Sequence, residues 1–280
     1  MIAKFNNINI IYSIFEILKE IKIEVNIKFY SKKIEIKDVS TDKTMAFDFY
    51  IDVDKLQEYK YTPDISVIGL NTSYMCSILK LIEKDNLMSL EVNENMRNKI
   101  IISSKNLQDH RESKIELELL EPEITETKNI VFENGAYITM KADDFYKLLN
   151  NIKVNCDTVK ITCSEKTISF EGMAQTMNCK FEYSEEKEDE KGNGISIKMA
   201  EGISIVVGMY SIESILKFKK CTKIGTKIQI YIAENSLLCL IHTVGDIGNF
   251  KAIITPVGLH NEQNEEEDEE IEYNDSEYDY

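Results

Sequence analysis

The chain contains the same alternating pattern twice, and this internal repeat is the strongest constraint on its fold. The stretch VNIKFYSKKIEIKDVSTDKTMAFDF (residues 25–49) aligns without a gap on VKITCSEKTISFEGMAQTMNCKFEY (residues 159–183), beginning with Val25 over Val159. Residues between the identical positions also agree in character. Because alternation of apolar and polar residues is typical of half-buried strands, the sequence predicts two copies of one strand-rich unit.

Helices and further strands are predicted around each copy in the same order. Before each copy, apolar residues recur at the i, i+3, i+4, i+7 spacing of a one-sided helix, and another short helix follows each copy. The predicted helices span residues 11–21, 71–84, 145–152 and 210–220. Two alternating strands then follow in each half, at 87–92 with 100–104 and at 227–232 with 237–242. The sequence therefore predicts an α+β fold in which each half contains two β-α-β-β-β repeats.

Composition and motifs argue against several classes of function. A length of 280 residues with 43% hydrophobic residues is typical of a globular protein of one large or two medium domains. The six cysteines form no CxxC pair and the three histidines lie far apart, so we expect buried thiols and no metal site. The HExxH, Ser-His-Asp and glycine-rich phosphate-binding motifs are missing, and the acidic pair Asp143 and Asp144 opens a helix. We therefore expect a protein that is not an enzyme and needs no cofactor.

The negative charge is concentrated at the C-terminus. The stretch HNEQNEEEDEEIEYNDSEYDY carries eleven acidic residues and no lysine or arginine, so the remaining chain accounts for only −5 of the formal charge of −16. Such a segment cannot bury enough apolar surface to offset its conformational entropy, and residues 259–280 are expected to be a disordered acidic tail. Basic surfaces therefore remain possible on the folded part.

Three segments are candidates for contacts with other molecules. Residues 121–135 are acidic, contain a proline and carry an apolar cluster, which indicates a connector that packs on something. Residues 114–119 and 177–183 alternate cleanly. If both are edge strands, one subunit can extend the sheet of the next, head to tail, and such a contact closes a ring when the angle allows. If both are internal strands, no such contact exists.

Two motifs resemble the sliding clamps of the proliferating cell nuclear antigen (PCNA) type. The run IHTVGDIGNFKAIITPV (residues 241–257) is similar to the family's C-terminal hairpin, with its Asp-x-Gly turn at Asp246 and its final Pro256 before an acidic tail. The helix NTSYMCSILKLIEKDN is similar to the family's second helix, with Tyr74 where the family has methionine. With the duplication, the resemblance covers residues 1 to about 258.

The resemblance implies a ring that encloses DNA and tethers replication proteins to it. Three chains would form a homotrimer of six similar domains around double-stranded DNA, with helices lining the hole and antiparallel sheets forming the outer wall. The expected units are an N-terminal clamp domain, an interdomain connecting loop, a C-terminal clamp domain and the tail, at residues 1–120, 121–135, 136–258 and 259–280. Expected partners are a DNA polymerase, a clamp loader and other proteins with clamp-binding peptides, in a nucleus or a viral replication compartment.

Three groups of residues are expected to carry this function. Sequence-independent sliding needs contacts to phosphates, which lysines on the polar helix faces supply: Lys19, Lys22, Lys80, Lys84, Lys147, Lys153, Lys217 and Lys220. Glu16, Glu20 and Glu213 should weaken this positive field. By resemblance, a pocket for partner peptides is lined by Val39, Thr44, Ile124, Ile130, Val131, Phe132, Leu237, Ile253, Ile254, Thr255 and Pro256. The subunit interface would use Ile115, Leu117, Leu119, Met177, Cys179, Phe181 and Tyr183.

Other functions remain compatible with the same sequence. The chain could be one subunit of a heterotrimeric checkpoint clamp, or a viral processivity factor that does not form a ring. Ile253 and Ile254 could be ordinary strand core, and any one lysine could belong to a solvated helix face. An acidic histone-chaperone-like module is a further alternative, but it leaves the lysine-bearing helices unexplained.

Overall fold

The computed structural model describes residues 1–83, 86–93, 96–106, 111–122, 132, 134–174, 177–187, 189, 194–233 and 236–257. In the first half the elements are β1 (Ile2–Phe5), α1 (Ile8–Ile21), β2 (Glu24–Phe29), β3 (Lys33–Val39), β4 (Met45–Asp52), η1 (Val53–Lys55), β5 (Glu58–Lys60), β6 (Val67–Asn71), α2 (Thr72–Leu79), β7 (Leu87–Asn93), β8 (Met96–Lys105) and β9 (Glu112–Glu118). Among the described residues, no helix is both long and apolar enough to cross a bilayer.

The second half repeats this order. Its elements are β10 (Ala136–Lys141), α3 (Ala142–Lys153), β11 (Thr158–Ser164), β12 (Thr167–Met173), β13 (Asn178–Ser184), β14 (Ser196–Met199), β15 (Ile205–Ser211), α4 (Ile212–Leu216), η2 (Lys219–Lys223), β16 (Lys227–Ile232), β17 (Leu238–Val244) and β18 (Gly248–Ile254). Apart from the short strands β5 and β14, each half reads β-α-β-β-β twice, which confirms the predicted α+β repeat.

The helix starts follow from local sequence. The Asn7 side chain caps α1 by accepting hydrogen bonds from the backbone N–H groups of Asn9 and Ile10, and Asn71 caps α2 in the same way. The last helix is shorter than predicted, because β15 continues to Ser211, whose hydroxyl caps α4. Beyond Leu216 the chain tightens into the 3₁₀ turn η2.

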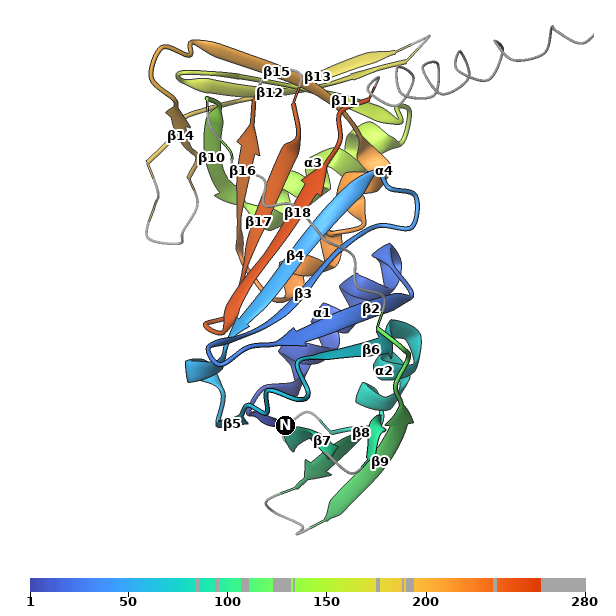
Figure 1. The fold of residues 1–280 in the computed structure, drawn as a ribbon. Coiled ribbons are helices and arrows are strands. Elements are labelled where there is room, and N and C mark those ends of the chain that lie inside the picture. Colours follow the sequence, from blue (N-terminus) through green and yellow to red (C-terminus); the bar gives the residue numbers. More distant parts are fainter. Residues whose placement is uncertain are drawn as a thin grey trace, which may run out of the picture.

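A single nine-stranded antiparallel sheet joins the two halves. Its strand order is β14-β10-β16-β17-β18-β4-β3-β2-β6, and Figure 1 shows β18 directly beside β4 at the centre of the molecule. This joint between the halves runs from Gly248 opposite Ile51 to Ile254 opposite Met45. A five-stranded sheet (β5-β1-β7-β8-β9) and a four-stranded sheet (β13-β12-β11-β15) lie at the two ends.

The sheets show that the two halves are built alike. The five-stranded sheet has the same order as β14-β10-β16-β17-β18, and the four-stranded sheet has the same order as β4-β3-β2-β6. In this correspondence β9 is the counterpart of β18, and β13 is the counterpart of β4. The strands β4 and β18 pair with each other at the joint between the halves. Their counterparts β13 and β9 instead lie at the ends of their own sheets.

Candidate nucleic-acid interface and partner-binding surface

The four helices form a continuous layer on one side of the central sheet (Figure 1). Within this layer α1 contacts α2, α3 contacts α4, and η2 contacts α1 across the joint between the halves. The apolar sides of the helices are buried in the main core, as Phe15 of α1 and Phe145 of α3 illustrate. The polar sides of the four helices therefore lie on the same side of the sheet.

Lys19, Lys80 and Lys147 form an exposed set of positive charges on this layer. Each lies on or directly after a different helix, and none forms an ion pair with any described residue. Their ammonium groups are thus available to an anion. Lys84, which was predicted with them, lies outside the described residues.

The other predicted lysines bind carboxylates of the same chain. Lys22 Nζ lies 2.8 Å from Asp38 Oδ1, and the Asp38 side chain is only 4% exposed. Lys153 pairs with Asp157 at 2.7 Å, four residues further along the chain and beyond the end of α3. Removing one partner of a buried ion pair strongly destabilises the folded protein, because it leaves an unpaired buried charge. Lys22 therefore has a structural role whatever else it contacts.

Within the described part of the chain, three ion pairs cross the joint between the halves. Lys217 Nζ lies 3.2 Å from Asp42 Oδ2, Lys220 Nζ 2.8 Å from Glu20 Oε1, and Lys223 Nζ 2.8 Å from Glu16 Oε2. The sequence suggested that Glu16 and Glu20 dilute the positive field of the helices. The structure shows how this happens: Glu20 neutralises Lys220 and Glu16 neutralises Lys223, each from the other half of the chain.

The ionisation of these groups reflects their pairing. Partial burial alone would raise the pKa of Glu16, but the Lys223 ammonium outweighs it and lowers that pKa. The hydrogen bond to Glu20 raises the pKa of Lys220. Both changes favour the charged forms, so the pairs persist at neutral pH.

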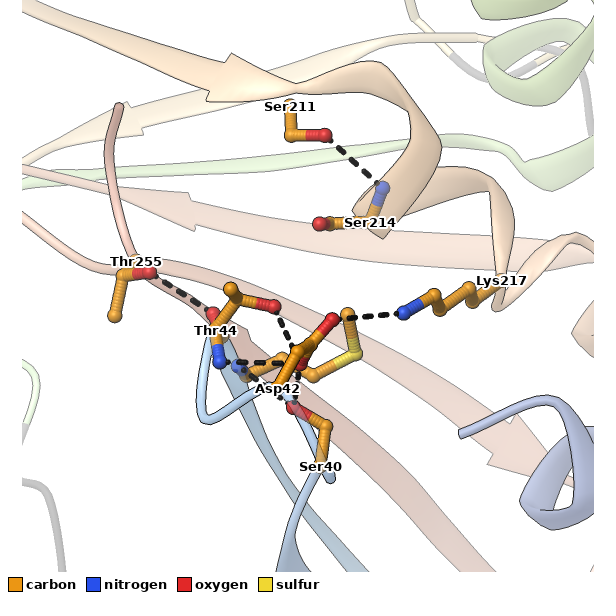
Figure 2. Close-up of polar contacts among 8 residues, drawn as sticks. Ser40, Asp42, Thr44, Ser211, Ser214, Lys217 and Thr255 are labelled. Atoms are coloured by element: carbon orange, nitrogen blue, oxygen red, sulfur yellow. Dashed lines mark hydrogen bonds and ion pairs between the residues drawn. The ribbon is translucent and has the colours of Figure 1, made fainter. Parts of the chain in front are cut away.

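Asp42 is the centre of a polar network at the end of the joint (Figure 2). Its Oδ1 accepts hydrogen bonds from the hydroxyls of Ser40 (2.5 Å) and Thr44 (2.8 Å), and its Oδ2 accepts from Lys217. Partial burial alone would raise the pKa of Asp42, but these donors outweigh it and hold the pKa well below its usual value. The Thr44 carbonyl in turn accepts a hydrogen bond from the Thr255 hydroxyl at 2.9 Å. The network thus ties the β3–β4 turn to α4 and to the end of β18.

An apolar row crosses the outer face of the central sheet, opposite the helices. Strand register places its members side by side: Val39 opposite Ala46, Ala46 opposite Ile253, Ile253 opposite Cys239, Cys239 opposite Tyr231 and Tyr231 opposite Tyr137. Tyr231, Cys239 and Ile253 form a buried cluster separate from the main core, with Leu237 and Phe132 packed against it. Of the predicted pocket residues, Leu237 and Ile253 belong to this cluster, and Val39 lies at the end of the row, separated from Ile253 by Ala46. Tyr231, Cys239 and Tyr137 were not foreseen.

Phe132 holds one end of the connector on this row. Its ring meets the Tyr231 ring edge-on, with centroids 4.8 Å apart, and Lys251 Nζ lies 5.3 Å from the Phe132 ring centroid. The Tyr137 hydroxyl donates a hydrogen bond to the Phe132 carbonyl at 3.0 Å. The expectation that the connector packs on something therefore holds at Phe132. Ile124, Ile130 and Val131 lie outside the described residues.

Ile254 does not belong to this outer surface. It is 1% exposed and lies in the main core with Phe250 and Ala252, which occupy the same face of β18. Because side chains alternate along a strand, Ile253 and Ile254 point to opposite faces, and only Ile253 can line an outer pocket. Thr44 and Thr255 are partly buried beside the row, and Pro256 is buried.

Both predicted edge strands end a sheet. Among the described strands, β9 pairs with β8 alone and β13 with β12 alone, so each leaves backbone groups available to a further strand. Ile115, Leu117 and Leu119 are half-buried at the first edge, and Cys179, Phe181 and Tyr183 at the second. Met177, just before the second edge strand, is 44% exposed.

A duplicated α+β unit with helices on one face, a shared antiparallel sheet on the other and two free counterpart edges defines the class of DNA sliding clamps. Residues 1–127 match the family model "Proliferating cell nuclear antigen, N-terminal domain", and residues 128–257 match "Proliferating cell nuclear antigen, C-terminal domain". The chain belongs to the proliferating cell nuclear antigen family, which confirms the resemblance seen in the sequence.

Two similar proteins come from viruses. "Probable DNA polymerase sliding clamp" of Acanthamoeba polyphaga mimivirus is 27% identical over 200 residues, which cover 70% of this chain and 40% of that protein. "Probable DNA polymerase sliding clamp 1" of Paramecium bursaria Chlorella virus 1 is 22% identical over 249 residues, which cover 89% of this chain and 94% of that protein. The chain thus spans less than half of the first relative and nearly all of the second.

Proposed function

We propose that the chain forms a closed homotrimeric ring that encircles duplex DNA and tethers a DNA polymerase and other replication proteins to it. The ring has no catalytic role, and the viral relatives favour work in a viral replication compartment. The observation that carries the proposal is the correspondence of β9 with β18 and of β13 with β4. A joint that forms within the chain can then be repeated between chains, head to tail, by strands of the same kind.

The correspondence also gives the register of the subunit contact. The internal joint places Ala252 opposite Phe47 and Ile254 opposite Met45. Matching the register of the two halves puts Ile115 and Leu117 at the positions of Ala252 and Ile254. Phe181 and Cys179 take the positions of Phe47 and Met45. Leu117 of one subunit therefore faces Cys179 of the next.

This register has a direct chemical test. The variant Leu117→Cys should form a disulfide with the native Cys179 of the neighbouring subunit under mild oxidation, because opposite residues of an antiparallel pair lie within disulfide reach. Denaturing gels should then show species up to three times 32.3 kDa. The same variant with Cys179→Ser is the control and should stay monomeric on the gel. Light scattering on the non-oxidised wild type gives its mass in solution. A mass equal to one subunit would refute the homotrimer.

DNA contact is assigned to the exposed lysines of the helix layer. Lys19, Lys80 and Lys147 should bind phosphates without reading bases, so affinity should be weak and strongly salt-dependent. Replacing all three by alanine should reduce the slope of log affinity against log salt by about 0.9 for each phosphate that is no longer neutralised. Lys153→Ala is the matched control, because its ammonium is already paired with Asp157. Equal slopes for the triple variant and the wild type would rule out this surface.

Partner peptides are assigned to the apolar row on the outer face. A peptide with an aromatic plug would pack beside Phe132, over Ile253 and Leu237, where burial of aromatic surface usually dominates the binding energy. Phe132→Ala should lower the affinity for such a peptide by roughly tenfold, as measured by calorimetry. Tyr74→Ala is the control, since Tyr74 is 62% exposed on α2, in the helix layer on the other side of the sheet. Equal affinities for both variants would exclude this row as the docking surface.

A further inference from the structure

The two most exposed large apolar side chains of the described part of the molecule lie in the helix layer. Val154 is 77% exposed and Leu81 is 75% exposed. Val154 directly follows α3, and Leu81 follows α2 by two residues. Nothing in the described chain covers either side chain. A surface that covered either side chain would gain the free energy of removing its apolar area from water.

The repeat assigns each of these residues a counterpart in the other half. The gapless alignment of the first repeat places Val154 on Glu20, and it matches buried Leu18 of α1 with buried Ile152 of α3. In the second repeat, η2 is a tighter 3₁₀ turn, so the match moves by one residue from the offset of the caps Asn71 and Ser211. Aligning the buried pairs Leu79 with Phe218 and Ile82 with Cys221 then places Leu81 on Lys220.

Glu20 and Lys220 are themselves partners. Lys220 Nζ lies 2.8 Å from Glu20 Oε1, and this ion pair bridges the joint between the two halves. At the joint between subunits, the end of α2 in one chain would face the end of α3 in the next. There the counterparts of Lys220 and Glu20 are the apolar residues Leu81 and Val154. The substitution is complementary on both sides, whereas replacing one member alone would leave a charge opposite an apolar group.

We propose that Leu81 of one subunit packs against Val154 of the next, an apolar contact that takes the place of the Glu20–Lys220 ion pair at the subunit joint. The occupant of this surface is therefore a second copy of the chain. The inference rests on the proposed ring and adds the specific contact on its inner side. The internal joint is held partly by charge, whereas the subunit joint excludes charge at the same position.

The test is a charge exchange measured by light scattering over a dilution series. Leu81→Lys and Val154→Glu should each raise the concentration at which the trimer dissociates by at least about tenfold, because each buries an unpaired charge. The double variant Leu81→Lys with Val154→Glu should recover most of the loss, because it rebuilds the ion pair of the internal joint. Ile205→Lys, on a strand outside the helix layer, is the control and should dissociate like the wild type.

The possible outcomes separate this contact from the ring itself. Weakening by the single variants with recovery in the double variant supports the contact. If the wild type is a trimer and the single variants dissociate at the same concentration as it does, the contact is overturned. The proposed ring is not affected by that result. Additive weakening in the double variant also overturns it, because residues in contact must show coupling. A wild type that is monomeric throughout the series overturns both proposals.

Discussion

Acidification from about pH 7.5 to about pH 5.0 should lower the free energy of unfolding by about 2 kcal/mol through His242 alone. This side chain is fully buried in β17. Its Nε2 lies 2.9 Å from the Tyr146 hydroxyl, and its Nδ1 has no hydrogen-bond partner among the described residues. Burial lowers the pKa of His242 from 6.5 to about 3, because the imidazolium ion would lose its hydration.

The sign and size follow from proton linkage. Between the two pKa values the unfolded chain binds a proton that the folded chain does not, so acid favours the unfolded chain. The stability is intact above the unfolded value of 6.5 and falls as the pH approaches 3. One pKa unit corresponds to about 1.4 kcal/mol, so the one and a half units between 6.5 and pH 5.0 give about 2 kcal/mol. The folded value hardly affects this figure, because it lies well below pH 5.0.

The assay is urea unfolding at both pH values for the wild type and for His242→Gln, at one protein concentration. The glutamine keeps a hydrogen-bonding group near Tyr146 but does not titrate. Asp42, Glu16 and the other carboxylates change equally in both proteins, so the difference between the two pH effects isolates His242. That difference should be about 2 kcal/mol. A difference close to zero would mean that the folded protein accommodates the imidazolium, which would refute the reasoning from burial.

Two further predictions concern the joint and the second domain. Lys223→Glu should lower the free energy of unfolding by up to about 1 kcal/mol, the upper range for an exposed ion pair, and adding Glu16→Lys should restore most of it in urea titrations. No recovery in the double variant would show that the pair contributes nothing. Gly172→Ala should lower stability by about 1–3 kcal/mol, because a Cβ there would lie 2.4 Å from Ile152 Cγ2. An unchanged melting temperature would show that α3 moves aside at little cost.

The repeat made most of the fold predictable from the sequence. Strand and helix periodicities are local signals, and the duplication supplied each weak signal twice. The alternation of β18 also contained the information that separates Ile253 from Ile254, since Phe250, Ala252 and Ile254 share one face. The pocket residues were carried over from the family by position, without use of this alternation, and Ile254 was therefore included.

The charge pairs could not be predicted in the same way. Lys223 and Glu16 belong to different halves, and their contact depends on the β4–β18 joint that brings α1 beside η2. A sequence shows that lysines and glutamates share the polar faces of helices. It does not show which lysines are neutralised, and this decides how many positive charges the helix layer offers to phosphates. The row that contains Tyr231 depends on the same joint, because its members come from both halves.

In the proposed ring, the two kinds of joint differ in what holds them together, and this difference determines where the ring opens. The internal joint combines the β4–β18 ladder with three ion pairs and with the covalent connector between the halves. The subunit joint combines the counterpart ladder with an apolar contact and has no covalent link. High salt would weaken the ion pairs of the first but not the apolar contact of the second. Because the connector would still hold the two halves together, the ring should open between subunits at any salt concentration. The contact between lysines and DNA phosphates is electrostatic, whereas the subunit contact is apolar. Rising salt should therefore weaken DNA binding before it weakens the closure of the ring.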